Sequence, residues 1–316
     1  GTSYTVEATS FNGSGGSENY RGTPTSATGS TLMPEPSQAT SIAFGTLADT
    51  SYAVSFTAGN GLSRLVVAKV GSAVDWTPTD GTAYTGENNN IGSAQEYGTG
   101  NFLVHRGTSP FTLSGLTAAT EYYIRIFEYQ GTNATLNYNV SAATGNPNNR
   151  YALSTEPTAH GSLTATAASD ASIDLSWGDA TGESGFVILR RAGAAPTGTP
   201  ADGTAYAAGN TIGDGTVAYA GTTAGAGSTT DSSLSADTTY YYKIFPYAYD
   251  GTEGHATYNY YTGGTPGNDS DTTGESEPAS SSSIVSFLPA SGTTATIAWT
   301  NTGSADGTIL LVKSGS

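Results

Sequence analysis

The chain has 316 residues, with 26 acidic side chains against 10 basic ones, a net charge of −16 at pH 7 and no cysteine. This charge repels phosphate backbones and anionic lipid surfaces, so the composition disfavours nucleic-acid and membrane partners, and the lack of thiols excludes disulfides and thiolate metal sites. No run of 18 apolar residues is present that would cross a bilayer. Abundant glycine, with 42 residues, and 20 tyrosines predict an all-β fold of short strands around aromatic cores.

Short phrases recur along the chain with a period of about 121 residues. Glu-Pro stands at Glu35, Glu156 and Glu277, and Asp-Gly-Thr-Ala-Tyr stands at 80–84 and 202–206. Repetition at a fixed period indicates an array of modules, each large enough to bury a core of its own. We therefore expect the end of a preceding module with its F–G hairpin at 1–27, complete modules at 36–147 and 157–266, and the first three strands of a following module at 278–316.

Each unit begins with a predicted strand pair. In 172–177 the apolar residues alternate with polar ones, which indicates a half-buried strand, and 185–191 forms a more continuous apolar run typical of a central strand. The pair recurs at 53–56 with 63–69 and at 295–299 with 308–313. A large aromatic ends the first strand of each pair, so the predicted cores contain Phe56, Trp177 and Trp299.

Later in each unit, a leucine precedes a tyrosine by six residues, at Leu116 with Tyr122 and at Leu234 with Tyr240. This spacing predicts a tyrosine corner, in which the ring packs inward and the hydroxyl bonds to backbone just upstream. Asp-Gly and similar pairs follow as hairpin turns. We add these four residues to the predicted cores.

The strand aromatic, the Leu-Tyr corner and the hairpin resemble fibronectin type III modules over the whole chain. The phrase at 59–67 and the later 98–101 are similar to modules of large secreted surface proteins of Bacteroidetes-type bacteria. This resemblance implies immunoglobulin-like β-sandwiches in an elongated array, used as extracellular adhesins, gliding-type filaments or spacers in secreted enzymes. Ordinary modules of the family are shorter, so we expect an insertion at about 71–100 and at about 192–221.

Alternate residues after each corner tyrosine form an outward aromatic column. Exposed, the column would be a ligand surface for sugar rings; covered by the insertion, with Arg125 and Lys243 lying across the rings, it would be a second core. The sequence favours the covered arrangement, with Trp76, Tyr84 and Tyr97, or Tyr206 and Tyr219, folding over it. The candidate ligand residues are Trp76, Tyr123, Phe127, Tyr129, Tyr241, Phe245 and Tyr247.

Catalytic chemistry has little support in the sequence. His105, His160 and His255 occupy unrelated positions in the repeat, and no nucleophile elbow, zinc helix, phosphate loop or calcium loop occurs. We predict no enzyme activity, no catalytic residue, no cofactor and no metal site.

Polar stretches ending in Glu-Pro, at 144–157 and 264–278, are expected to join the modules as stiff linkers. Together with these linkers, the resemblance implies that the chain is a non-catalytic stalk or spacer of a long extracellular bacterial surface adhesin or filament. Its partners would be neighbouring modules of the same chain, surface glycans or proteins bound through other domains, and laterally associated copies. The alternatives are glycan- or protein-binding repeats and the spacer of a secreted polysaccharide-degrading enzyme.

Overall fold

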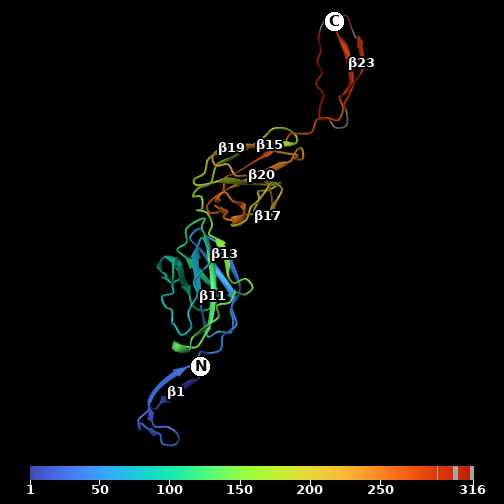
Figure 1. The fold of residues 1–316 in the computed structure, drawn as a ribbon. Helices are drawn as coiled ribbons and strands as arrows, with labels where there is room; N and C mark the ends of the chain where they lie inside the picture. The colour runs from blue at the N-terminus through green and yellow to red at the C-terminus, as the bar shows by residue number, and fades with distance from the viewer. Residues whose placement is uncertain (290, 302–304, 314–316) are drawn as a thin grey trace.

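A computed structural model describes residues 1–289, 291–301 and 305–313, and Figure 1 shows them as an elongated row of four parts. Two β-sandwiches stand in the middle of the row, and a smaller piece made of hairpins stands at each end. We call the sandwiches the first module (residues 36–153) and the second module (residues 155–274). The chain is all-β with tandem sandwiches, as composition and repeat predicted.

The first module packs a small sheet against a large one. Its elements are β5 Thr40–Gly45, β6 Ser51–Thr57, β7 Ser63–Val70, η1 Ile91–Ser93, β8 Gln95–Glu96, β9 Asn101–His105, β10 Phe111–Ser114, β11 Glu121–Gln130, η2 Asn133–Thr135, β12 Asn137–Tyr138 and β13 Asn148–Tyr151. The small sheet has the order β10-β6-β5, and the large sheet has the order β12-β11-β7-β9-β8, with β13 also on β11. All ladders are antiparallel, as in immunoglobulin-like sandwiches.

The second module repeats this plan. Its elements are β14 Leu163–Ala167, β15 Ser172–Trp177, β16 Gly185–Ala192, β17 Thr211–Ile212, β18 Gly215–Gly221, β19 Gly227–Ser232, β20 Thr239–Ala248, η3 Glu253–His255, β21 Asn259–Tyr260 and β22 Asn268–Thr272. The sheets have the orders β14-β15-β19 and β17-β18-β16-β20-β21, with β22 also on β20. The expected insertion therefore ends earlier than 221, because β18 is a strand of the large sheet.

The two end pieces are open sheets. Their strands are β1 Ser3–Ala8, β2 Phe11–Asn12, β3 Asn19–Tyr20 and β4 Thr25–Ser30 at the start, and β23 Ser283–Pro289 and β24 Ala295–Thr300 at the end. The prediction of a strand at 308–313 is wrong, because these residues have no regular secondary structure. Its counterparts β7 and β16 are each paired on both sides, and no described residue after 300 forms such a partner strand.

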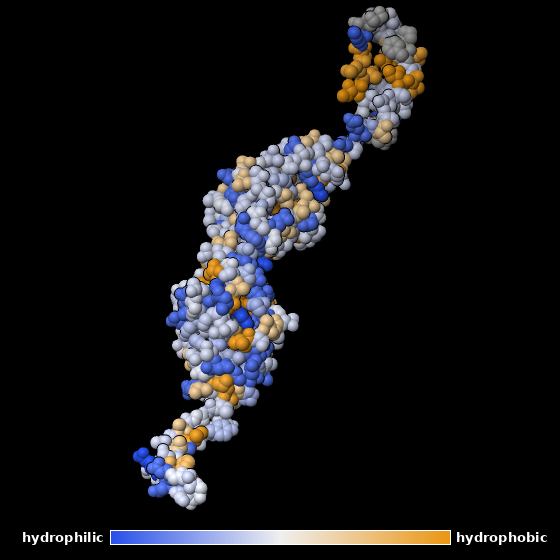
Figure 2. Space-filling view, in the orientation of Figure 1, coloured by the Kyte–Doolittle hydropathy of each residue, from blue (hydrophilic) through white to orange (hydrophobic). Residues whose placement is uncertain are grey.

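The prediction that Trp299 belongs to a core is wrong. Phe56 and Trp177 are buried in their modules, whereas Trp299 on β24 is 45% exposed. The hairpin β23–β24 has no facing sheet among the described residues, so its apolar side chains remain at the surface. Figure 2 shows apolar side chains gathered on this C-terminal hairpin.

Each module holds two cores, one on each face of its large sheet. In the first module the inner core lies between the sheets and contains Phe56, Leu116 and Tyr122; the second module repeats it with Trp177, Leu234 and Tyr240. The outer cores lie on the other face of the large sheet, under the insertions. A module is thus a three-layer structure, which explains how its additional residues are used.

The tyrosine corner takes the predicted form in both modules. The hydroxyl of Tyr122 accepts a hydrogen bond from Thr117 N at 2.8 Å, and that of Tyr240 accepts one from Ser235 N at 3.0 Å. Both rings are buried. The corner therefore fixes the start of β11 and β20 against the loop that precedes each strand.

The module ends predicted at 147 and 266 are too early. The polar stretches expected as linkers contain the last strand of each module, because β13 pairs with β11 and β22 pairs with β20. At the start of the chain, β4 likewise extends to Ser30, beyond the expected end at 27. The segments between modules are consequently short, and the modules contact one another directly.

Candidate functional site at the module junctions

The aromatic column proposed as a ligand surface is covered in both modules. Phe127, Tyr129, Phe245 and Tyr247 are buried, with at most 8% of each exposed, and Tyr123 and Tyr241 are half-buried. Such residues present no open platform to a sugar ring, so the ligand-surface interpretation is wrong for the column. The favoured alternative, in which the insertion covers the rings, is confirmed by the outer cores.

Different contacts hold the covering insertion in each module. In the first, Trp76 belongs to the cover and meets the rings of Tyr84 and Tyr97, with centroids 4.9 and 5.4 Å away. Arg125 lies 4.8 Å from the ring centroid of Phe127, as predicted. These contacts build an aromatic layer over the large sheet. Trp76 lies at the outside of this layer and is half-buried.

In the second module, Lys243 does not lie across the rings and Tyr219 does not cover them, although both contacts were predicted. Lys243 donates from its ammonium to Pro196 O at 2.6 Å, tying the insertion to the sheet. Tyr219 belongs to β18 and packs on Trp177, with ring centroids 4.7 Å apart, on the inner side of the sheet. Tyr206 alone keeps the predicted role, against Tyr260 in the outer core.

The repeated phrase Asp-Gly-Thr-Ala-Tyr binds the return strand of the F–G hairpin. Asp80 Oδ1 accepts from Tyr138 N at 2.8 Å, and the Tyr138 hydroxyl donates to Thr82 O at 2.9 Å. In the second module, Asp202, Tyr260 and Thr204 repeat these bonds at 2.8 and 2.9 Å. The most faithfully repeated sequence of the insertion thus fixes the hairpin β11–β12 or β20–β21 at one end of the module.

That hairpin receives the chain arriving from the preceding module. Met33 N donates to Thr135 O at 3.0 Å, and Asn137 Nδ2 donates to Met33 O at 2.7 Å. At the next junction Ser154 N donates to Thr257 O at 2.9 Å, and Asn259 Nδ2 donates to Ser154 O at 2.7 Å. We call this pair of bonds the junction clamp. It contacts only backbone atoms of the incoming residue, so Met33 and Ser154 fit equally well.

The second junction adds contacts that the first lacks. The rings of Tyr151 and His255 stack with centroids 3.9 Å apart and planes at 11°, and Arg150 Nη2 donates to Ala256 O at 3.2 Å. Gly203 of the repeated phrase has φ +72°, and a Cβ there would lie 2.8 Å from Arg150 Nη2. The positive φ favours glycine here, and the missing side chain leaves room for the Arg150 guanidinium beside the loop.

Carboxylates gather beside the second junction. Desolvation, with the nearby charges of Asp202 and Asp49, raises the pKa of Glu156. His255 Nδ1 lies 2.5 Å from Asp250 Oδ2. Partial burial by itself would raise the pKa of Asp250, but the hydrogen bonds from His255 and from Thr252 N outweigh it and lower the pKa. No group of three acidic, histidine or cysteine side chains arranged to hold a metal ion occurs in the part of the chain that the structure describes.

The histidines occupy three different environments. His105 stacks on Phe111 at 4.1 Å, and burial lowers its pKa. His160 packs beside Tyr261 at 4.5 Å, and only His255 lies at a junction. They do not converge on one site.

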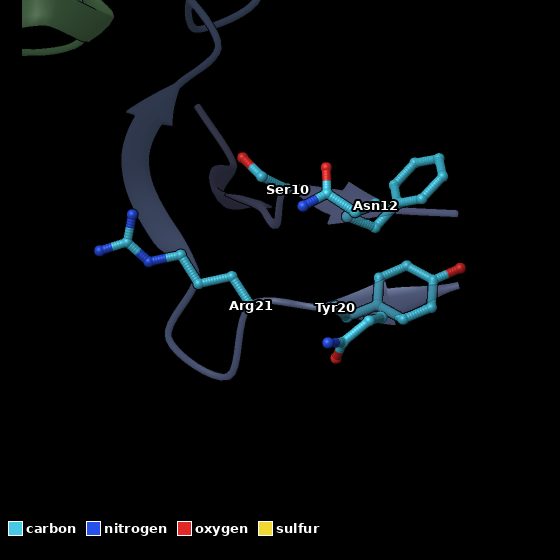
Figure 3. Close-up of a pocket in the computed structure, with 6 residues that line it drawn as sticks. Ser10, Asn12, Tyr20 and Arg21 are labelled. Carbon is cyan, nitrogen blue, oxygen red and sulfur yellow. The ribbon is translucent and has the colours of Figure 1, made fainter. Parts of the chain in front are cut away.

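The first part of the chain contains a third copy of the hairpin. Figure 3 shows Ser10, Asn12, Tyr20 and Arg21 around a shallow pocket beside β2 and β3. Asn19 and Tyr20 occupy the positions of Asn137 and Tyr138 in the repeat, and the Phe11 and Tyr20 rings, 5.3 Å apart, are exposed. No insertion among residues 1–33 covers them.

Sequence reasoning did not identify the junction clamp. Its one side-chain signal is the dipeptide Asn-Tyr, which recurs at residues 19–20, 137–138 and 259–260, but a dipeptide is too short to stand out in a chain rich in both residues.

The chain is similar in structure to fibronectin type III tandems. The FN1–FN3 domains of chicken CNTN1 share 12% identity with a TM-score of 0.37, covering 86% of this chain and 78% of theirs. A two-domain fibronectin type III segment of chicken tenascin shares 11% identity with a TM-score of 0.27, covering 75% of this chain and 100% of the segment. No family model and no curated protein matches the sequence.

Proposed function

We propose that this chain is a non-catalytic stalk or spacer segment of a long extracellular bacterial surface adhesin or filament, in which modules hold one another at a set orientation. The observation that carries the proposal is the junction clamp, which has the same two bonds where the chain enters the first module and where it enters the second. A stalk needs each module to restrict the orientation of its neighbour. Because the clamp binds only backbone atoms, it can hold any incoming residue other than proline, which has no N–H.

The covered aromatic column supports a structural role over a glycan-binding one, because its rings stabilise the module instead of facing solvent. No helix in the described part of the chain has the length and hydropathy to cross a membrane. The role as spacer of a secreted polysaccharide-degrading enzyme shares the same mechanics and differs only in what the spacer carries.

The test is the distribution of distances between the two modules. The chain has no cysteine, so Thr57→Cys and Thr230→Cys place one spin label on each module. We expect a narrow distribution by double electron–electron resonance, and a broader one in Asn259→Ala, which lacks the amide that holds Ser154 O. Asn88→Ala is the control, because Asn88 is an exposed insertion residue whose side chain bonds to Asn90 N. A native distribution as broad as that of Asn259→Ala would contradict the proposal.

A further inference from the structure

The first and last strands of the second module are joined through side chains. Ala165 N and Ala167 N on β14 point away from the partner strand β15 and donate to carboxylates of β22. Asp269 Oδ2 accepts the first bond at 2.9 Å, and Asp271 Oδ2 accepts the second at 2.7 Å. β14 and β22 belong to different sheets, so these bonds close the open side of the sandwich.

Each of these carboxylates is also fixed by its own strand. Asp269 Oδ1 accepts from Ser270 N at 2.9 Å, and Asp271 Oδ1 accepts from Thr272 N at 2.8 Å. Both bonds to β14 join residues 104 positions apart, so they advance in the same direction along both strands. The two strands therefore run parallel where the carboxylates connect them.

The first module makes the same connection with the opposite polarity. Asn146 Nδ2 donates to Ala39 O at 3.0 Å, and Asn148 Nδ2 donates to Ile42 O at 2.7 Å. Here the side chains supply donors to carbonyl groups at the start of the module, whereas in the second module they supply acceptors to N–H groups. Both modules thus close the same edge through two side chains near their last strand.

We propose that these pairs are latches that resist tension: the carboxylate latch (Asp269 and Asp271) and the amide latch (Asn146 and Asn148). The inference rests on the proposed function, because a stalk transmits tension from one end of each module to the other. With first and last strands parallel, tension enters and leaves at opposite ends of the pair and slides one strand along the other. Both bonds of a latch are then loaded together, and neither can open first and transfer the load to its neighbour.

The carboxylate latch is the stronger of the two per bond, because hydrogen bonds to an ionised acceptor are roughly twice as strong as neutral ones. The amide latch is supplemented by backbone bonds from Ser41 N to Thr144 O and from Ile42 N to Gly145 O, at 2.8 and 3.0 Å. The two modules therefore reach resistance by different chemistry at one position of the fold.

The test is the lifetime of each module under constant force, with the whole chain held by its ends. Forced unfolding reports the unfolding rate, and the two modules give two unfolding events. Asp269→Ala with Asp271→Ala should shorten one lifetime by about tenfold or more while the other stays unchanged. Asn146→Ala with Asn148→Ala should shorten the other lifetime instead.

Two controls in the second module separate the carboxylate latch from general stability. Ser270 lies on the same strand between the two aspartates. Ser270→Ala keeps both carboxylates, so it should leave both lifetimes unchanged. Tyr206→Phe weakens the second module away from β14 and β22, because the Tyr206 hydroxyl accepts from Ala201 N. At matched thermal midpoints, the latch variant should have the shorter lifetime under force. Equal lifetimes, or no effect of the latch substitutions, would overturn the inference.

Asp269→Asn with Asp271→Asn covers the case in which the alanine variant does not fold. Amides keep the acceptor oxygens but lose the charge, so the lifetime should fall by less than with alanine and more than with Ser270→Ala. Failure of the latch leaves the distance distribution between modules unaffected. A broad native distribution with intact latch effects would remove the proposed stalk and keep the latch.

Discussion

The two modules place opposite chemistry at one position of the same sandwich. In the first module, Arg64 on β7 lies opposite Glu128 on β11, and Arg64 Nε contacts Glu128 Oε1 at 2.8 Å. Both residues are buried, and the guanidinium lies 5.7 Å from the ring centroid of Phe56. Gly59 N also donates to Glu128 Oε1, at 3.0 Å.

In the second module the corresponding cross-strand pair is Phe186 with Pro246. Phe186 is fully buried, and its ring centroid lies 6.0 Å from that of Trp177. An ion pair beneath a phenylalanine is thus replaced by apolar packing beneath a tryptophan. The fold prescribes a buried pair of a certain volume here, and either chemistry satisfies it.

The exchange extends to a backbone bond. Glu128 N donates to Gln38 Oε1 at 3.1 Å in the first module. In the second module Pro246 replaces Glu128, and proline has no N–H to donate. Ala159 replaces Gln38, so the side-chain acceptor is missing as well. Donor and acceptor are both absent in the second module, so no buried group loses its partner.

The largest effect should come from breaking the ion pair on one side. Glu128→Ala leaves the buried Arg64 guanidinium without its carboxylate, and we expect a loss of about 3–5 kcal/mol in the free energy of unfolding of the first module. Chemical denaturation of the whole chain should show this as one transition shifted to lower denaturant, with the transition of the second module unmoved.

Replacing the whole set should reverse most of that loss. Gln38→Ala, Arg64→Phe and Glu128→Pro together give the first module the residues of the second, and apolar replacement of a buried ion pair is often neutral or stabilising. A combined variant as unstable as Glu128→Ala would show that the first module depends on the polar set itself, in which the Gln38 amide also donates to Asn139 O and Ser141 O.

The regular strands and the corner could be predicted because their signals are local. Alternation marked β15, a continuous apolar run marked β16, and the Leu-Tyr spacing marked the corner, each within a few residues. The last strands β13 and β22 were mistaken for linkers because they are short and polar, and their pairing is visible only once β11 and β20 lie beside them. Nothing in the sequence near Arg64 indicates that its partner lies 64 residues away.

The junction clamp was beyond prediction for a different physical reason. Met33 and Ser154 contribute only their backbone N–H and C=O groups, which every residue except proline provides alike. The side chains of these two residues therefore carry no trace of the contact. The covered aromatic column was easier, because a run of large aromatics in a strand belongs to a core more often than to a surface.

A smaller effect should follow from removing the aspartate of the repeated phrase. Asp202→Ala deprives the Tyr260 N–H of its acceptor, and we expect a cost of about 1–3 kcal/mol in the stability of the second module. Asp80→Ala should cost the first module a similar amount, since it bonds to Tyr138 N over the same distance. Chemical denaturation of the two single variants measures both costs; a large cost in one module alone would contradict their equivalence.

The smallest effect concerns the acid response of the two insertions, each of which pairs a cation at the end of one strand with an aspartate. Arg191 Nη1 contacts Asp214 Oδ2 at 2.6 Å, and Lys69 Nζ contacts Asp75 Oδ1 at 2.6 Å. Hydrogen bonds from Thr197 N and its hydroxyl, together with Gly198 N and Arg191, hold the pKa of Asp214 at about 2. Bonds from Lys69 and Asn101 lower the pKa of Asp75.

Because the pKa of Asp214 is lower in the folded chain than its usual 3.8, its contribution is complete above about pH 4 and is lost as the pH falls to about 2. The amide resonances of Thr197 and Gly198 should therefore titrate with a midpoint near 2 in nuclear magnetic resonance spectra. Asp214→Asn should abolish that titration and leave the titration of Asp75 in place. A midpoint near 3.8 at Thr197 would mean that the carboxylate does not hold the second insertion, and that Lys243 and its bond to Pro196 fix the insertion without it.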